Sequence, residues 1–277
     1  MIKIFTTKPA KEKIIKNEAS ASHFIPYKCH WNSNTIITHK EELLRVIKIK
    51  GFAFETADDI DIDLKKNARN NLLKGMASGN FSLYFHTFRR KEKGFPDGVM
   101  ADSFSERVNK EWANKHSDTR SFVNEHYITI IRGQNTSGVA GIANIAKKFQ
   151  HKADKSSWEN HMKESFDELD EMTERVLNGF GNYGAELLDI EEHNGILTSN
   201  LLSFLSKIIN CGYSAQVIAP MANIGNHLPI SRLYFGNKSI EVHHPNSIKY
   251  AGMVAIKEYR PSTHAEFLMV LCRCHLN

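Results

Sequence analysis

The order of helices and strands predicted for the first 133 residues most constrains the fold of this 277-residue chain. Two strands rich in β-branched residues, Thr35–Thr38 and Leu43–Gly51, predict a hairpin. A helix follows and ends near Gly75, because apolar residues recur at every fourth position: Ile60, Leu64, Ala68 and Leu72.

A strand, a helix and another strand complete this first part of the chain. The strand Phe81–Arg90 has apolar residues on both faces, which predicts an interior position in a sheet. The helix carries apolar residues four positions apart, and the last strand is His126–Arg132; the helical residues are Phe104, Val108 and Trp112. This order predicts an α+β fold in which helices pack on one side of a mostly antiparallel sheet.

The second half of the chain predicts a similar plan around one long helix, Ser156–Asn178. Ser156 and Glu159 fit a capping box, and Gly179 ends the helix. One face forms an apolar stripe and the other is acidic and expected to be solvated; the stripe is Trp158, Met162, Phe166, Leu169, Met172 and Val176. A strand at Ala185–Ile190, a helix from about Leu197 to Ile209 and a hairpin starting at Arg232 follow.

These patterns divide the chain into two successive α/β subdomains. We predict a flexible basic arm at 1–22, a first subdomain at 23–133, a Gly- and Ser-rich linker at 134–155 and a second subdomain at 156–263. Residues 264–277 form the tail.

Composition indicates a globular protein with a core, since 41% of the residues are hydrophobic and 24% are charged. Four irregularly spaced cysteines predict no disulfide framework and a reducing compartment. No apolar run reaches the roughly 18 residues that a spanning helix needs. We therefore expect a cytoplasmic chain whose basic arm permits peripheral contact with an anionic membrane.

Five carboxylates near the start of the first helix suggest either a metal site or a charged helix start; they are Glu55, Asp58, Asp59, Asp61 and Asp63. A calcium loop opening at Asp59 fails, because Leu64 replaces the glycine and Asn70 replaces the bidentate glutamate. Acids in a first turn are instead stabilised by the helix dipole, and Thr56 with Asp59 resembles a capping box. We interpret the cluster as a helix start.

Other chemical motifs are also incomplete. Gly133 and Gly138 have phosphate-loop spacing without the required Lys and Ser or Thr, and Gly236–Ser239 lacks the second glycine. The terminal Cys272, Cys274 and His275 have only the distant Cys29 and His30 as further zinc ligands. We predict no catalytic, cofactor-binding or metal-binding residues in this chain.

Two polar clusters are interpreted as ordinary surface. His243 and His244 precede Pro245 in a predicted turn. A basic cluster lies at a strand end and could contact phosphate, but a solvated loop is favoured; it comprises Arg89, Arg90, Lys91 and Lys93.

Three segments in order resemble landmarks of one family. They read F-I-P-Y-K-C-H-W-N-S-N-T-I-I-T-H-K-E-E-L-L-R-V-I-K-I-K-G-F-A-F-E-T at 24–56, F-V-N-E-H-Y-I-T-I-I-R at 122–132, and, within 231–263, S-R-L-Y-F-G-N-K-S-I-E-V and Y-A-G-M-V-A-I-K-E-Y-R-P-S-T. Together they resemble the amino-terminal region of the CagE/TrbE/VirB family, the ATPases of bacterial type IV secretion systems. Residues 264–277 depart from the family's pattern, so we expect an aberrant tail on a truncated chain.

The resemblance implies a docking and assembly module of a secretion and conjugation ATPase, peripheral to the inner membrane. In the full-length family ATP and magnesium bind a nucleotide-binding domain that follows this region, so we expect this chain to be inactive alone. Its implied partners are inner-membrane channel subunits and further copies of itself, with no direct nucleic acid. Two alternatives stay open: part of an active ATPase whose motor domain is encoded separately or lies outside this sequence, and a nucleic-acid-binding module using the basic clusters.

Overall fold

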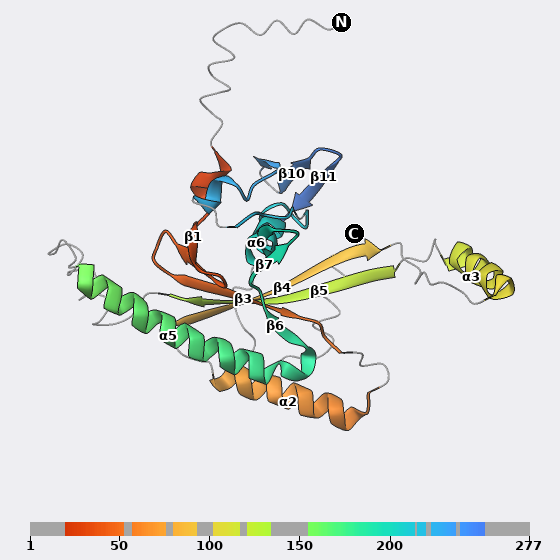
Figure 1. The fold of residues 1–277 in the computed structure, drawn as a ribbon, viewed down its shortest axis with the longest axis horizontal. Coiled ribbons are helices and arrows are strands. Elements are labelled where there is room, and N and C mark those ends of the chain that lie inside the picture. Colours follow the sequence, from red (N-terminus) through yellow and green to blue (C-terminus); the bar gives the residue numbers. More distant parts are fainter. Residues whose placement is uncertain are drawn as a thin grey trace, which may run out of the picture. The chain divides into compact units, whose positions relative to one another are not determined.

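The computed structural model describes residues 20–52, 57–75, 80–92, 102–116, 121–133, 155–213, 215–219, 223–236 and 239–252. The chain divides into two units, Met1–Ile230 and Ser231–Asn277 (Figure 1). The predicted arm and linker lie mostly outside the described residues, and the tail 264–277 lies entirely outside them. The predicted subdomain division stays a prediction.

The first unit is built on a six-stranded sheet whose pairings are all antiparallel. The strand order is β1-β2-β3-β5-β4, and β6 pairs with β3 beside β2. The strands are β1 (Tyr27–Asn32), β2 (Thr35–Thr38), β3 (Leu43–Ile49), β4 (Phe81–Glu92), β5 (Ser121–Arg132) and β6 (Ala185–Leu187).

The helices of this unit are α2 (Asp59–Gly75), α3 (Ser103–His116), α5 (Lys155–Gly179) and α6 (Asn200–Ile209), with short 3-10 turns η1 (Ala21–Phe24), η2 (Gly181–Tyr183) and η3 (Ile224–Asn226). A two-stranded hairpin, β7 (Ile190–His193) with β8 (Ile196–Ser199), precedes α6. The α+β class with mostly antiparallel sheets is confirmed, as are the predicted helices at α2, α3 and α5 and the β2–β3 hairpin.

Both faces of the sheet are covered by apolar contacts, which differs from the one-sided arrangement expected. On one face Ile47, Ile128 and Ile130 pack with the apolar stripe of α5. On the other face Val46 and Tyr127 pack with Leu201, Phe204 and Leu205 of α6. Figure 1 shows α5 along one side of the sheet and α6 on the other. Alternate residues of β3 and β5 therefore enter two different cores.

The same two-sided burial explains why the interior position predicted for Phe81–Arg90 is wrong. This segment is β4, which is the last strand of the sheet. Phe81 and Leu83 contact the core under α5, whereas Phe88 contacts the core under α6. Apolar residues on both faces of a strand thus indicate that the sheet is covered on both faces. They do not indicate whether the strand has a neighbour on each of its two edges.

Two arginines on the α5 side of the sheet are buried and paired with acids of that helix. Nε of Arg45 donates to Thr35 Oγ1 at 2.8 Å, and its Nη1 donates to Asp170 at 2.7 Å. Nε of Arg132 donates to Glu168 at 2.6 Å. Glu168 belongs to the face of α5 that was expected to be solvated, but Glu168 and Asp170, each about half exposed, fix the helix on the sheet through these buried arginines.

The helix α2 packs against the end of α5 through a close approach at Gly179. A Cβ added to Gly179 would lie 2.6 Å from Leu72 Cδ2, so a side chain there would require the Leu72 side chain to move. Leu72 and Leu73 reach the core under α5, whereas Ile60 and Leu64 are exposed.

The second unit contains a three-stranded antiparallel sheet in the order β11-β10-β9. Its strands are β9 (Arg232–Phe235), β10 (Ile240–His244) and β11 (Ser247–Ala251), which confirms a hairpin at Arg232. His243 and His244 were expected in a turn, but they end β10 and the turn follows them.

We predict that Asp170→Ala destabilises the protein by about 1.5 kcal/mol, because the buried guanidinium of Arg45 loses a charge-assisted hydrogen bond. Chemical denaturation followed by circular dichroism measures the change. Asp167→Ala on the same helix is the control, since Asp167 is exposed. Equal stability of the two variants would contradict a structural role for the ion pair.

Candidate binding pocket

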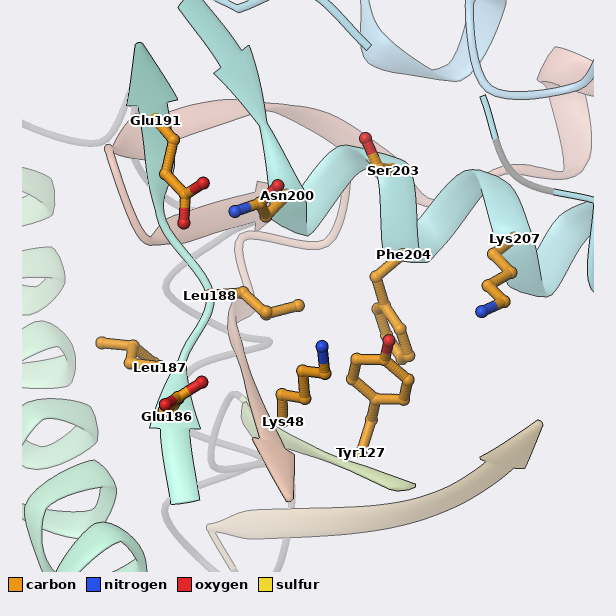
Figure 2. A pocket seen from close by; sticks show the side chains of 10 residues that line it. All are labelled: Lys48, Tyr127, Glu186, Leu187, Leu188, Glu191, Asn200, Ser203, Phe204 and Lys207. Carbon is orange, nitrogen blue, oxygen red and sulfur yellow. The ribbon is translucent and has the colours of Figure 1, made fainter. Parts of the chain in front are cut away.

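A pocket of about 350 Å³ lies between the sheet and α6, within the first unit (Figure 2). The strands β3, β5, β6 and β7 and the helix α6 all contribute to it. Its lining residues are Lys48, Tyr127, Glu186, Leu187, Leu188, Glu191, Asn200, Ser203, Phe204 and Lys207. This volume is at the low end for ligand sites and suits one or two side chains of a partner.

The position of α6 follows from its sequence, which is apolar except for a few polar residues. Ser199 caps the helix by accepting a hydrogen bond from the Leu202 N–H at 3.1 Å, so the helix begins three residues later than Leu197. Leu197 itself belongs to β8. The Ser199 hydroxyl also meets His30 Nε2 at 3.1 Å, which ties the start of α6 to β1.

Aromatic rings form one wall of the pocket. The ring centroids of Tyr127 and Phe204 are 4.6 Å apart, and Phe88 stands behind them at 5.8 Å from Tyr127. His86 contacts Phe204 edge-on at 5.3 Å, and burial lowers the pKa of His86, which favours the neutral ring. The wall is rigid because four rings from β4, β5 and α6 interlock.

One carboxylate organises the basic end of the pocket. Glu125 accepts hydrogen bonds from Lys207, from the Tyr127 hydroxyl at 3.1 Å and from Arg90 Nε at 3.2 Å. Burial raises the pKa of Glu125. The hydrogen bond and charge of Lys207, together with the hydrogen bonds from Tyr127 and Arg90, lower the pKa by more than burial raises it, so the pKa is below its usual value. Glu125 therefore stays ionised and holds Lys207 in place.

The hydroxyl of Tyr127 stays protonated for a related reason. Burial, and then the neighbouring charge of Glu125, raise its pKa well above the usual value. Lys207 is also held 4.8 Å from the centre of the Phe88 ring. Lys207 and Tyr127 are thus engaged by the protein itself.

Lys48 is the cation that the pocket leaves available. It stands opposite Tyr127 on β5 and opposite Glu186 on β6. Glu186, however, accepts its hydrogen bond from Lys50. Among the described residues no hydrogen bond or ion pair is recorded for the ammonium of Lys48, and Figure 2 shows this group pointing into the pocket. Asn200 lies beside Glu191 at the opposite, acidic end.

None of the residues considered as sites in the sequence lines this pocket. Asp59 and Asp61 form the first turn of α2, as a charged helix start predicts, while Glu55 and Thr56 lie outside the described residues. Within the part of the chain that the structure describes, no group of three metal-ligating side chains occurs. Cys29 and His30 lie on β1, and 272–275 are outside the described residues.

The Gly-rich and basic segments have structural roles where they are described. The N–H of Gly133 donates to the Asn80 carbonyl at 2.9 Å, and Gly236 N–H donates to the Ser239 carbonyl at 3.0 Å in the turn between β9 and β10. The guanidinium of Arg89 lies 4.4 Å from the Phe122 ring centre, and Arg90 pairs with Glu125. Lys93 and Gly138 are outside the described residues.

Sequence reasoning missed the pocket because its residues are spread from Lys48 to Lys207. Two signals point to it in retrospect. Lys207 is a lone charge in the apolar helix N-L-L-S-F-L-S-K-I-I, and Lys48 is a charge at the last position but one of a strand whose other residues are buried. A charge at such a position needs a partner or a ligand.

Comparison with known proteins finds similarity to components of type IV secretion systems in two segments of the chain. Residues 34–139 match the family described as "Type IV secretion system ATPase VirB4/TrbE, N-terminal domain". Residues 186–276 match the "CagE, TrbE, VirB family, component of type IV transporter system". This match includes all but the last residue of 264–277, the tail that was expected to depart from the family's pattern. The two matched segments are thus similar to successive domains of type IV secretion system proteins.

Curated relatives show the same similarity. The chain is 27% identical over 250 residues to type IV secretion system protein virB4 of Bartonella henselae, covering 90% of this chain and 32% of that protein. It is 27% identical over 258 residues to virB4 of Brucella suis biovar 1, covering 92% and 31%. It is 24% identical over 259 residues to PtlC of Bordetella pertussis, covering 91% and 30%. The chain thus spans about a third of the length of these relatives.

The two matched segments are joined in the structure and share the pocket. Lys48 and Tyr127 come from the first segment, and the lining residues from Glu186 onward come from the second. The pairing of β3 with β6 and the ion pair of Glu125 with Lys207 connect them. The pocket therefore exists only when both segments fold together.

We predict that Glu125→Gln lowers the free energy of unfolding by about 1 kcal/mol at pH 7, because Lys207 and Arg90 lose a charged acceptor. The folded pKa of Glu125 is depressed, so its contribution is complete above the unfolded pKa of about 4.3 and is lost as pH falls through the folded value. Denaturation at pH 7 and at about pH 3 measures the difference between wild type and variant, which should shrink in acid.

Glu164→Gln provides the control, since Glu164 is exposed on α5 and should leave stability unchanged at both pH values. A difference between wild type and Glu125→Gln that stays constant across this pH range would contradict the role given to the ionised carboxylate.

Proposed function

We propose that this chain is a docking and assembly module of a type IV secretion ATPase, which binds inner-membrane channel subunits and holds copies of the ATPase together without hydrolysing nucleotide itself. The observation that carries the proposal is the pocket shared by the two family segments. Because the pocket forms only from both segments together, a function of this pocket would explain why the two segments occur in one chain.

The chemistry of the pocket supports protein recognition. It offers an available ammonium at Lys48, an aromatic wall at Tyr127 and Phe204, and acids at Glu186 and Glu191. An acidic side chain of a channel subunit would pair with Lys48 while its flanking apolar groups pack on the rings. We propose this pocket as the place where a channel subunit docks.

The two alternatives have less support. Arg89 and Arg90 of the basic cluster are engaged by Phe122 and Glu125, which weakens the case for nucleic acid. The sequence Gly133–Gly138 lacks the Lys and Ser or Thr of a phosphate loop, so the ATPase alternative requires a motor domain outside this sequence. Within the described residues no helix is long and apolar enough to cross a membrane. The similarity to type IV secretion proteins supports a location peripheral to the inner membrane, where the channel subunits are.

We predict that Lys48→Glu raises the dissociation constant for detergent-solubilised channel subunits of the same secretion system at least tenfold, which corresponds to about 1.4 kcal/mol. The reversed charge would meet Glu186 and Glu191 and repel an acidic ligand. Biolayer interferometry with immobilised wild-type and variant protein measures the affinity.

Lys28→Glu is the matched control, because Lys28 is an exposed lysine on β1 of the same sheet and should leave the affinity unchanged. Equal affinities of Lys48→Glu and wild type would rule out docking at the pocket, and absence of binding by the wild type would rule out docking altogether. ATP hydrolysis by the purified chain above a contaminant control would overturn the non-catalytic part of the proposal.

A further inference from the structure

Within the described residues, β4 lies at one end of the six-stranded sheet, so one of its two edges has no strand beside it. β4 pairs with β5 over twelve residues, from Phe81 opposite Arg132 to Glu92 opposite Ser121, without a register shift. It is last in the strand order, and no strand within the described residues pairs with its other edge. Twelve residues are about twice the usual length of a strand.

The first eight residues of this edge lack the features by which proteins prevent edge pairing, whereas its last four, Arg89–Glu92, are charged. Between Phe81 and Phe88 the sequence F-S-L-Y-F-H-T-F contains no proline, no glycine and no charged residue. The strand at the opposite end of the sheet is different: β1 has six residues, carries the exposed Lys28 and has two register irregularities against β2. Long, regular and uncharged edges pair readily with another strand.

Two large aromatic side chains are exposed at the middle of β4. Tyr84 is 54% exposed and Phe85 is 58% exposed, and as successive residues of a strand they point to opposite faces. The apolar surface at this edge therefore extends over both faces of the strand. A strand added here would cover both side chains as well as the backbone groups.

We propose that β4 of a second copy of this chain pairs antiparallel with β4, so that two sheets join into one across a two-fold axis. This inference deepens the assembly part of the proposed function, because it names the surface through which copies associate. A two-fold axis perpendicular to the sheet keeps each side chain on its own face of the sheet. Paired residues must lie on the same face, so one residue of β4 must lie directly opposite its own copy, with the axis midway between them.

A register centred on Phe85 places no two like charges opposite each other. Phe85 lies opposite its own copy, Tyr84 lies opposite His86, and Leu83 lies opposite Thr87. Arg89 then lies opposite Phe81 and Arg90 opposite Asn80, so neither arginine faces a like charge. Opposite aromatic and cation–aromatic pairs stabilise neighbouring strands. The edge of β4 is thus complementary to itself, which is why a second copy is its occupant.

Sedimentation velocity of the purified chain over a concentration series tests the proposal. We expect a wild-type monomer–dimer equilibrium and, for Phe85→Lys, a dissociation constant raised at least tenfold, because each lysine would face its copy. Tyr250→Lys is the matched control: Tyr250 is an aromatic residue, 69% exposed, on the edge strand β11 of the other unit, and its substitution should leave the equilibrium unchanged.

Cysteine cross-linking gives a second readout that does not depend on destabilising the edge. In a variant with its four cysteines replaced by serine, Phe85→Cys should form a disulfide between copies under mild oxidation, since directly opposite Cβ atoms are about 5 Å apart. Thr87→Cys should not, because in this register each copy of residue 87 faces Leu83.

Each outcome decides between the claims. A wild-type monomer at all concentrations, or a dimer that only Tyr250→Lys disrupts, would overturn the β4 interface. Neither result would affect docking to channel subunits, which is measured separately by the affinity of immobilised protein for those subunits. Loss of docking with intact β4 pairing would overturn the proposed function and leave the interface standing.

Discussion

The fold depends on β3, a seven-residue strand that is buried along nearly its whole length. One edge of β3 pairs with β5 at every residue, and the other edge is shared by β2 at Leu43 and Leu44 and by β6 from Ile47 to Ile49. Strands β2, β5 and β6 are therefore all hydrogen-bonded to β3. Because successive side chains of β3 alternate between the two cores, a slip of one residue would exchange Arg45 with an apolar neighbour and disrupt both.

Charged residues within these apolar surfaces determine where each helix rests. Arg45 and Arg132 place α5 through Asp170 and Glu168, and Glu125 places α6 through Lys207. Apolar packing alone is tolerant of small shifts, whereas a buried charge that loses its partner is costly. Apolar packing thus stabilises the helices on the sheet, and the ion pairs determine their exact positions. The pocket between the sheet and α6 therefore keeps a defined shape.

The sequence predicts the elements better than their arrangement, for reasons visible in particular residues. The stripe from Trp158 to Val176 predicts α5, since helical periodicity is a local property. The position of β4 at the sheet edge is not local, because Phe81 and Phe88 would be apolar in any strand between two cores. The pocket is less predictable still, since Lys48, Glu186 and Lys207 meet only when β6 pairs with β3. Asn210 illustrates the same limit: it is fully buried and holds the Leu228 carbonyl and the Ile230 N–H, a role that no motif signals.

Glu125 links the two surfaces to which we assign a function. It accepts Arg90 from β4 and accepts Lys207 and Tyr127 from the pocket, so one carboxylate lies between the strand edge and the docking site. A substitution at Glu125 would disturb both surfaces together and could not assign an effect to either. Phe85 and Lys48 each belong to one surface, and no recorded hydrogen bond within the described residues connects either of them to Glu125. Separate effects at these two positions would therefore show that strand pairing and docking are independent properties of one sheet.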